Sequence, residues 1–394
     1  MHDMEARHII EAVRSGIPSR AVGSYFTEAR PQILNKIRGF LNAAADEGKS
    51  SGMIVSGRYG EGKTHLLNTV FSMAHAQNMV VSMVPLSKEI PFDKMHQVYL
   101  RLMHNTYLPG SNQPGFMDVV DGRLKDTTFA NDLLLYANTE LERNRICYLL
   151  RTYLKEDDDE EKIQLQADLE GDFLTDSAIK RRYRANYHEP AKFDQSFVKT
   201  KNTMDYFQFM SYLFERMGYN GWVLLFDEAE LIGRLGKKGR LNAYRNMAEF
   251  LMPSQKLRSV FSLFAVTASY AEDVIEGKHD YENLKELYPD DPEPMKTVLG
   301  AIEKATELKP LTEREVEQVV EGIIELHGRA YGWDPKVSVG CMMCELRHAG
   351  FLLRTKLRTA IEILDQKYQY GDGGTVETGE LMENEIPDLT EMDE

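Results

Sequence analysis

An eight-residue motif constrains the fold of this chain more than any other feature of its sequence. It reads Gly57-Arg58-Tyr59-Gly60-Glu61-Gly62-Lys63-Thr64 and follows the pattern G-x-x-x-x-G-K-[ST]. The apolar run Met53–Ser56 before the motif predicts a short buried strand, and a helix is predicted over Lys63–Gln77. Glycines let such a loop curl until successive N–H groups point at a phosphate, and the helix N-terminus adds its dipole. A chance glycine-rich turn is the alternative, and the flanking strand and helix argue against it.

The polar residues of this motif predict ligands for a nucleotide and its metal ion. Lys63 is expected to reach the β- and γ-phosphates, and the Thr64 hydroxyl is expected to ligate Mg²⁺. The predicted nucleotide-binding set comprises Gly57, Gly60, Glu61, Gly62, Lys63, Thr64 and His65.

An acidic pair is the second sequence feature that predicts a nucleotide-binding site. The apolar run Trp222–Phe226 predicts a buried parallel strand that ends in Asp227 and Glu228, where α/β sheets place their ligands. Asp227 is expected to hold Mg²⁺, directly or through water, and Glu228 to polarise an attacking water. The alternative is that the pair only caps the next helix. The guanine-reading pattern Asn-Lys-x-Asp does not occur, because Asn35-Lys36-Ile37-Arg38 lacks the acid, so ATP is favoured over GTP.

Strands that alternate with helices predict an α/β fold with a parallel sheet and helices on both faces. A polar, helical stretch interrupts this alternation, and the chain becomes entirely helical after Leu311. The predicted organisation is N-terminal helices over 1–50, a nucleotide-binding core over 51–107 and 202–311, a helical insertion over 108–201, a helical lid over 312–370 and a disordered acidic tail over 371–394.

The net charge of −15 is concentrated in two segments. Glu156–Glu161 contributes six acidic residues and Gly371–Glu394 contributes nine, with no Lys or Arg in either. We expect a solvated loop and a disordered tail, because such blocks repel themselves; a mimic of nucleic acid or a docking tail for a basic partner is the alternative. Since the remainder is neutral, the net charge does not exclude DNA.

Two basic clusters are the predicted DNA contacts. Lys180–Arg184 interleaves cations with an aromatic residue, which suits phosphate neutralisation and base stacking, although this face could equally pair with the upstream acidic run. The second cluster, Arg234–Arg245, begins in a glycine-rich stretch, Gly233–Arg240, that we expect to be a mobile loop, either solvated or in contact with DNA or a neighbouring subunit.

Cysteine usage and apolar runs predict a cytoplasmic protein without a membrane partner. The three cysteines cannot build a disulfide framework. Of these, Cys341 and Cys344 form a C-x-x-C that we interpret as two buried thiols, since no second pair completes a zinc site. The start of the chain is charged, and the longest apolar runs are far shorter than the roughly 20 residues of a membrane span.

With these residues in hand, the chain resembles AAA+ P-loop ATPases on the Orc-like and STAND side, and more closely the ATP-binding proteins of BREX phage-defence systems (the BrxC/BrxD type). The resembling segments are Ala12–Arg20, Gly57–Leu67, Val81–Pro91, the strand that ends in Asp227-Glu228-Ala229-Glu230, and Leu308–Trp333. The resemblance implies an ATP-hydrolysing switch or motor, active as a homo-oligomer (ring or filament) on or around DNA. The alternative function is an ATP-gated scaffold or loader with little ATP turnover, which recruits a helicase or nuclease partner. A small-molecule kinase is the third hypothesis.

The resemblance also implies roles for individual residues. Thr267, with Ser269 second, would be the sensor that contacts the attacking water or γ-phosphate. Arg358 in Leu357–Ile361 would be the lid arginine that contacts the γ-phosphate, and because the usual Gly-Asp is missing before it, Arg354 competes. An arginine finger from a neighbouring subunit would come from one of Arg234, Arg240, Arg245 and Arg258.

Overall fold

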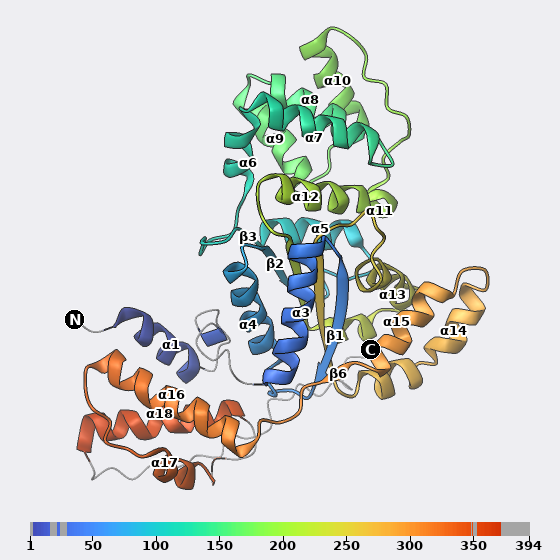
Figure 1. The fold of residues 1–394 in the computed structure, drawn as a ribbon. Helices are drawn as coiled ribbons and strands as arrows, with labels where there is room; N and C mark the ends of the chain where they lie inside the picture. The colour runs from blue at the N-terminus through green and yellow to red at the C-terminus, as the bar shows by residue number, and fades with distance from the viewer. Residues whose placement is uncertain (1–2, 16–21, 24–29, 348, 350–352, 372–394) are drawn as a thin grey trace. The chain divides into compact units, whose positions relative to one another are not determined.

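The computed structural model describes residues 3–15, 22–23, 30–347, 349 and 353–371. The chain divides into two compact units (Figure 1). Unit 1 comprises Met1–Pro31, Tyr59–Thr69 and Lys309–Glu394, and unit 2 comprises Gln32–Arg58 and Val70–Leu308.

Unit 2 is built on a six-stranded sheet with the order β3-β2-β4-β5-β1-β6. Every pairing is parallel except that of β3 with β2. The apolar run before the acidic pair forms β4, and all of its residues are buried, as expected of a strand covered on both faces. The strands are β1 (Ser51–Gly57), β2 (Val80–Pro85), β3 (Thr106–Tyr107), β4 (Trp222–Asp227), β5 (Val260–Thr267) and β6 (Thr306–Glu307).

Aromatic side chains attach helices to both faces of this sheet. On one face, Phe40 of α3 stacks on Phe261 of β5 with ring centroids 5.5 Å apart. On the other, Phe250 of α13 lies 5.8 Å from Phe226 of β4. The predicted α/β fold with a parallel sheet flanked by helices is therefore confirmed. The helices around the sheet are α3 (Pro31–Glu47), α4 (Lys63–Ala76), α5 (Met95–His104), α12 (Met204–Arg216), α13 (Lys237–Leu251), α14 (Asp280–Leu287) and α15 (Glu293–Glu303), with short helices η1 (Ala229–Arg234) and η2 (Ala271–Glu276).

A group of helices lies between β3 and α12 in sequence. Figure 1 shows most of this group, including α7 to α10, on the side of α12 that faces away from the sheet. Its hydrophobic core continues into that of the sheet. The guanidinium of Arg145 is fully buried there and binds the carboxylate of Asp168 through two hydrogen bonds of 2.9 and 2.8 Å. These helices are α6 (Met117–Leu124), α7 (Thr127–Thr139), α8 (Arg145–Lys155), α9 (Asp159–Leu169), α10 (Asp176–Tyr187) and α11 (Lys199–Asn202).

The acidic run Glu156–Glu161 is only partly a loop. Asp159, Glu160 and Glu161 form the first turn of α9, and the Asp158 carboxylate caps that helix by accepting the Glu161 N–H at 2.9 Å. Carboxylates at a helix N-terminus are stabilised by the helix dipole. The expectation of a loop was therefore wrong for this half of the run, although Asp159 and Glu160 are exposed, as expected of solvated residues.

Unit 1 has its own core, formed by α1 (Met4–Ser15), α16 (Glu313–Tyr331), α17 (Val339–Leu346) and α18 (Leu353–Tyr370). Arg14 of α1 donates to both carboxylate oxygens of Asp365, at 3.1 and 2.7 Å. Because the Trp333 indole N–H donates to Nδ1 of His327, the proton of a neutral His327 ring is on Nε2, which lies 3.0 Å from Asp365. The N-terminal helix therefore packs with the C-terminal helices, while the domain boundaries proposed from sequence remain a prediction.

The expectation of two buried thiols in unit 1 was wrong. Cys341 and Cys344 are both exposed on α17, whereas Met342 and Leu346 point into the core. Within the described residues, no group of three or more His, Cys, Asp or Glu side chains could hold a metal ion, and no helix is both long and apolar enough to cross a membrane. The predicted acidic tail, apart from Gly371, lies outside the described residues.

Candidate nucleotide-binding site

Three neighbouring strands end at one edge of the sheet with residues predicted to bind nucleotide. Gly57, the last residue of β1, is paired with Thr267, the last residue of β5. The Ala268 N–H donates to the Gly57 carbonyl at 3.2 Å. Since β5 lies between β1 and β4, one strand separates the end of β4 at Asp227 from the end of β1, and the register of β4 with β5 sets Phe226 level with Phe264. The fold thus places Thr267 between the acidic pair and the start of the phosphate loop.

The phosphate loop has the backbone that its glycines allow. Gly60 has φ +80° and Gly62 has φ +90°, values that residues with a side chain rarely adopt. α4 begins at Lys63, and its first turn contains no acidic residue, so no carboxylate there would repel an anion. Lys63 is buried, and Thr64 is half-buried one position further along. These features fit a phosphate group at the start of α4.

Arg30 contacts this loop, although it was not among the residues predicted from the sequence to bind nucleotide. Its Nη2 donates to the Glu61 carbonyl at 2.7 Å and to the Lys309 carbonyl at 3.1 Å. Its own backbone N–H donates to the Glu315 carboxylate at 3.2 Å. Burial lowers the pKa of Arg30, and the charges of Glu61 and Glu315 oppose that shift. No sequence motif marks this residue, because its partners are distant carbonyls.

The acidic pair is held in an unusual backbone geometry. Glu228 has φ +53° and ψ +35°, the left-handed conformation, and its N–H donates to Oδ1 of Asp227 at 3.0 Å. The Asp227 carbonyl accepts the Leu86 N–H from the segment after β2. The Glu228 side chain is exposed and makes no capping hydrogen bond to η1 within the described residues, which disfavours the interpretation of Glu228 as a simple helix cap. Left-handed conformations of residues other than glycine occur often at functional sites.

The two lid arginines differ in their surroundings. Arg354 is exposed near the start of α18, and Arg358 is half-buried one turn later. The Nε of Arg358 is buried and has no hydrogen-bond partner among the described residues. The choice between the two arginines stays a prediction.

Arg240 is not available as an arginine finger or a DNA contact. It is buried, its Nη2 lies 2.6 Å from the Asp280 carboxylate, and its Nη1 donates to the Leu235 carbonyl at 2.8 Å. The Tyr244 hydroxyl also donates to Asp280, at 2.9 Å. The glycine-rich stretch expected to be a mobile loop is mostly helical, since η1 ends at Arg234 and α13 begins at Lys237. That expectation was wrong because Arg240 anchors α13 to α14.

The Arg240–Asp280 pair leads to a stability prediction. Asp280→Ala leaves a buried guanidinium without its counter-charge, so we expect the free energy of unfolding to fall by about 3–5 kcal/mol. Urea denaturation measures this loss. Asp291→Ala is the matched control, because the Asp291 carboxylate is 67% exposed and 3.7 Å from Arg245; it should cost less than about 1 kcal/mol. Equal losses in the two variants would contradict the prediction.

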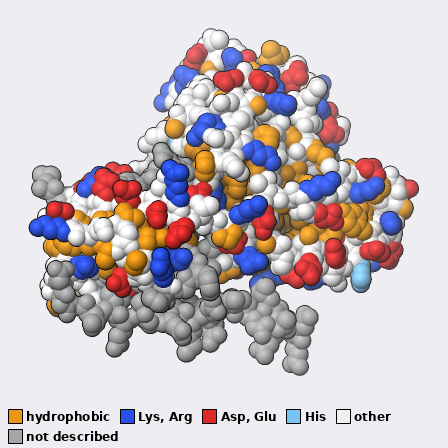
Figure 2. Space-filling model, turned by 60° about the horizontal axis from the view of Figure 1, so that its bottom comes forward, with side chains coloured by type: hydrophobic (Ala, Val, Ile, Leu, Met, Phe, Trp, Pro, Cys, Tyr) orange, Lys and Arg blue, Asp and Glu red, His pale blue; other side chains and the backbone are white. Residues whose placement is uncertain are grey.

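The basic cluster Lys180–Arg184 lies on α10, and only part of it faces solvent. Arg182 is buried and pairs with Glu161, while the Asn186 amide donates to Glu156 at 3.0 Å. Part of this face therefore pairs with the acidic run, which was the open alternative. Lys180, Arg181 and Arg184 are exposed. Basic and acidic side chains are interspersed on the face shown in Figure 2 rather than separated by sign.

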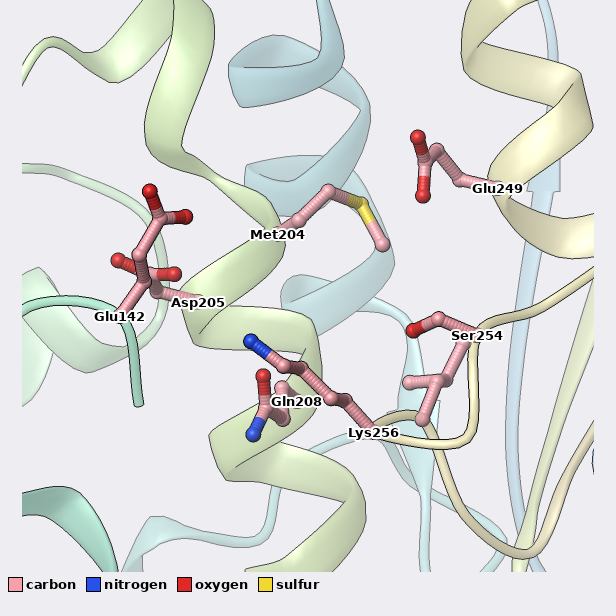
Figure 3. Close-up of a pocket in the computed structure, with 8 residues that line it drawn as sticks. Glu142, Met204, Asp205, Gln208, Glu249, Ser254 and Lys256 are labelled. Carbon is pink, nitrogen blue, oxygen red and sulfur yellow. The ribbon is translucent and has the colours of Figure 1, made fainter. Parts of the chain in front are cut away.

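A polar pocket of about 110 Å³ lies away from the nucleotide motifs (Figure 3). Part of its wall is the segment that leads into the N-terminal end of β5, the opposite end of the strand from Thr267. Burial raises the pKa of Asp205, an effect that Arg143 opposes, and burial also raises the pKa of Glu249. The lining residues are Glu142, Met204, Asp205, Gln208, Glu249, Ser254, Lys256 and Leu257.

The sheet order and the glycine-rich loop between β1 and α4 define an α/β protein with a P-loop nucleotide-binding core. The sequence matches the model of the family described as BREX system ATP-binding protein BrxC/D over residues 1–131 and 138–365. The chain belongs to this family, so it is an ATP-binding protein of a phage-defence system. The resemblance found from its motifs is thereby confirmed. No curated protein matches the chain.

Proposed function

We propose that this protein hydrolyses ATP with Mg²⁺ at the edge of the sheet where β1, β5 and β4 end. The observation that carries the proposal is the shared edge, on which Thr267 separates the phosphate-loop strand from the strand that ends in Asp227 and Glu228. Steady-state phosphate release from purified protein tests it. Release should require Mg²⁺ and stop with EDTA, and ATP binding without release would contradict hydrolysis.

In this proposal different residues of the chain bind the phosphates, hold the metal ion and activate water. The loop N–H groups, together with Lys63, hold the β- and γ-phosphates, and Thr64 and Asp227 hold Mg²⁺, which supplies charge neutralisation. Glu228 orients and polarises water, and Thr267 donates to that water or to the γ-phosphate. Arg358 contacts the γ-phosphate from the lid. The exposed carboxylate of Glu228 supports its assignment, because a general base must reach water.

The alternative is an ATP-gated scaffold or loader that recruits a helicase or nuclease of the defence system. The family description names ATP binding, which this function and an ATPase both require. Stoichiometric retention of ATP with negligible turnover, in the presence of DNA and partner proteins, would favour this function over an ATPase.

We propose further that the protein acts as a homo-oligomer and contacts DNA. An arginine finger from a neighbouring subunit requires an accessible guanidinium, and among the candidates Arg234 and Arg258 are exposed. Mass photometry with and without ATP and duplex DNA tests assembly and DNA binding together.

For DNA, the exposed cations of α10 make a specific prediction. Arg181 and Arg184 are three residues apart on one helix face and are both exposed. The double change Arg181→Glu and Arg184→Glu should weaken duplex binding and reduce the magnitude of its log–log salt slope by roughly two. Fluorescence anisotropy at several salt concentrations measures the slope. Lys125→Glu is the control, since the Lys125 side chain is 78% exposed on another part of the insertion; an unchanged slope in the double variant would contradict the contact.

A further inference from the structure

We infer that Arg30 positions the phosphate loop and couples nucleotide binding to the first helix of the C-terminal lid. The inference rests on the proposed binding of ATP phosphates by this loop. It concerns a group of contacts that we term the Arg30 bridge: Arg30 with the carbonyls of Glu61 and Lys309 and with the carboxylate of Glu315.

The first half of the bridge acts on the loop backbone. The Glu61 carbonyl belongs to the peptide group that joins Glu61 to Gly62. Because that group is planar and trans, its N–H points away from its carbonyl, so a hydrogen bond of 2.7 Å to the carbonyl also fixes the direction of the Gly62 N–H. A cationic donor also polarises the amide and makes its N–H a stronger donor. Arg30 thereby orients and strengthens a loop N–H without touching the nucleotide.

Steric fit supports this position for the guanidinium. A Cβ atom added to Gly62 would lie 3.4 Å from Nη1 of Arg30, so the side chain packs directly behind the loop. Gly62 also has φ +90°, a conformation that the loop must maintain to present its amides. The Arg30 side chain therefore supports a segment of backbone in a conformation that glycine adopts readily and other residues rarely adopt.

The second half of the bridge leads to α16. The same Nη2 donates to the carbonyl of Lys309, in the segment that precedes the lid. The backbone N–H of Arg30 donates to Oε1 of Glu315, while Oε2 of Glu315 accepts the N–H of Thr312 at 2.8 Å in the capping box of α16. Arg30 itself holds a left-handed backbone, φ +63°, which this carboxylate stabilises. If phosphate binding shifts the Glu61 carbonyl, Arg30 moves with it. Because the Arg30 backbone is bonded to Glu315, this movement reaches the capping box at Thr312, the N-cap of α16.

The test compares Arg30→Gln and Arg30→Lys with wild type in binding of ATP, ADP and adenosine, the last by competition. Glutamine removes the charge, and lysine keeps it but lacks the planar fork that reaches two carbonyls. We expect Arg30→Gln to lose about tenfold in affinity for ATP and ADP, with adenosine unchanged and Arg30→Lys intermediate. Arg38→Gln is the control, because Arg38 is exposed on α3 and donates to Asn35 of its own helix.

Hydrogen exchange of the amides of residues 313–316 measures the coupling. ATP should slow exchange there in wild type and in Arg38→Gln, and should have no such effect in Arg30→Gln. Unchanged ATP affinity in Arg30→Gln, or an equal loss of affinity for ATP and adenosine, would overturn the role inferred for Arg30. Neither result would contradict the proposed function. A wild-type protein that fails to bind ATP would overturn the proposed function as well.

Discussion

Lys63→Ala should abolish measurable ATP binding at micromolar nucleotide. Lys63 is the first residue of α4 and follows two glycines with positive φ, so it stands at the start of the helix into which the curled loop leads. A charge-assisted hydrogen bond to phosphate contributes about 2–3 kcal/mol, and its loss lowers affinity by roughly 30- to 150-fold. Isothermal titration calorimetry with Mg-ATP measures the change without requiring turnover.

The control for Lys63→Ala must separate lost binding from lost folding, because Lys63 is buried. Thermal unfolding of the variant should remain cooperative. Lys125→Ala, which removes a side chain that is 78% exposed, should bind ATP as wild type does. If a folded Lys63→Ala protein bound ATP with wild-type affinity, the phosphate-loop assignment would be wrong.

Glu228→Gln should slow ATP hydrolysis by about 10²- to 10⁴-fold and leave ATP affinity within about threefold of wild type. The exposed Glu228 carboxylate follows β4 directly, at the sheet edge that the phosphate loop also leaves. Glutamine preserves the length of the side chain but cannot accept a proton from water. Phosphate release under saturating ATP measures the rate. We expect the variant to keep ATP bound and to hydrolyse it slowly.

Glu276→Gln makes the same chemical change at an exposed position in η2, and it should have wild-type turnover. Unchanged turnover in Glu228→Gln would exclude Glu228 as the base. Negligible turnover already in wild type, with tight ATP binding, would instead support the scaffold or loader.

Local patterns predicted the elements of the core well. The motif Gly57–Thr64 and the apolar run before Asp227 are each contiguous in sequence, so strand, loop and helix could be located without tertiary information. The structure extends the predicted strand Met53–Ser56 to Ser51–Gly57, and it contains the helix Glu313–Tyr331 in the stretch after Leu311 that was predicted to be helical. Helices α14 and α15 were missed. The sequence of α14 is short and polar, whereas α15 has apolar residues at helical spacing, Met295, Val298, Leu299 and Ile302, that could have predicted it.

The errors occurred where charged or sulfur-containing side chains find partners far away in sequence. Arg240 was predicted to lie in a basic, glycine-rich loop. In the structure it forms a buried ion pair with Asp280, forty positions later in the sequence. Arg182 reads as part of a nucleic-acid contact, but Glu161 pairs with it. Cys344 was expected to be buried because its neighbours are apolar, but the helical period directs Met342 and Leu346 inward instead.

The sequence by itself determined that a phosphate loop and an acidic strand end exist, because each depends on contiguous residues whose backbone chemistry is local. Only the tertiary structure decided that β5 places Thr267 between them, since sheet order depends on which strands pair. It also decided that Arg30 hydrogen-bonds the loop at the Glu61 carbonyl and that Arg182 and Arg240 are buried in ion pairs. Those outcomes depend on long-range contacts, in which the free energy of burying a charge is set by partners that no local pattern reveals.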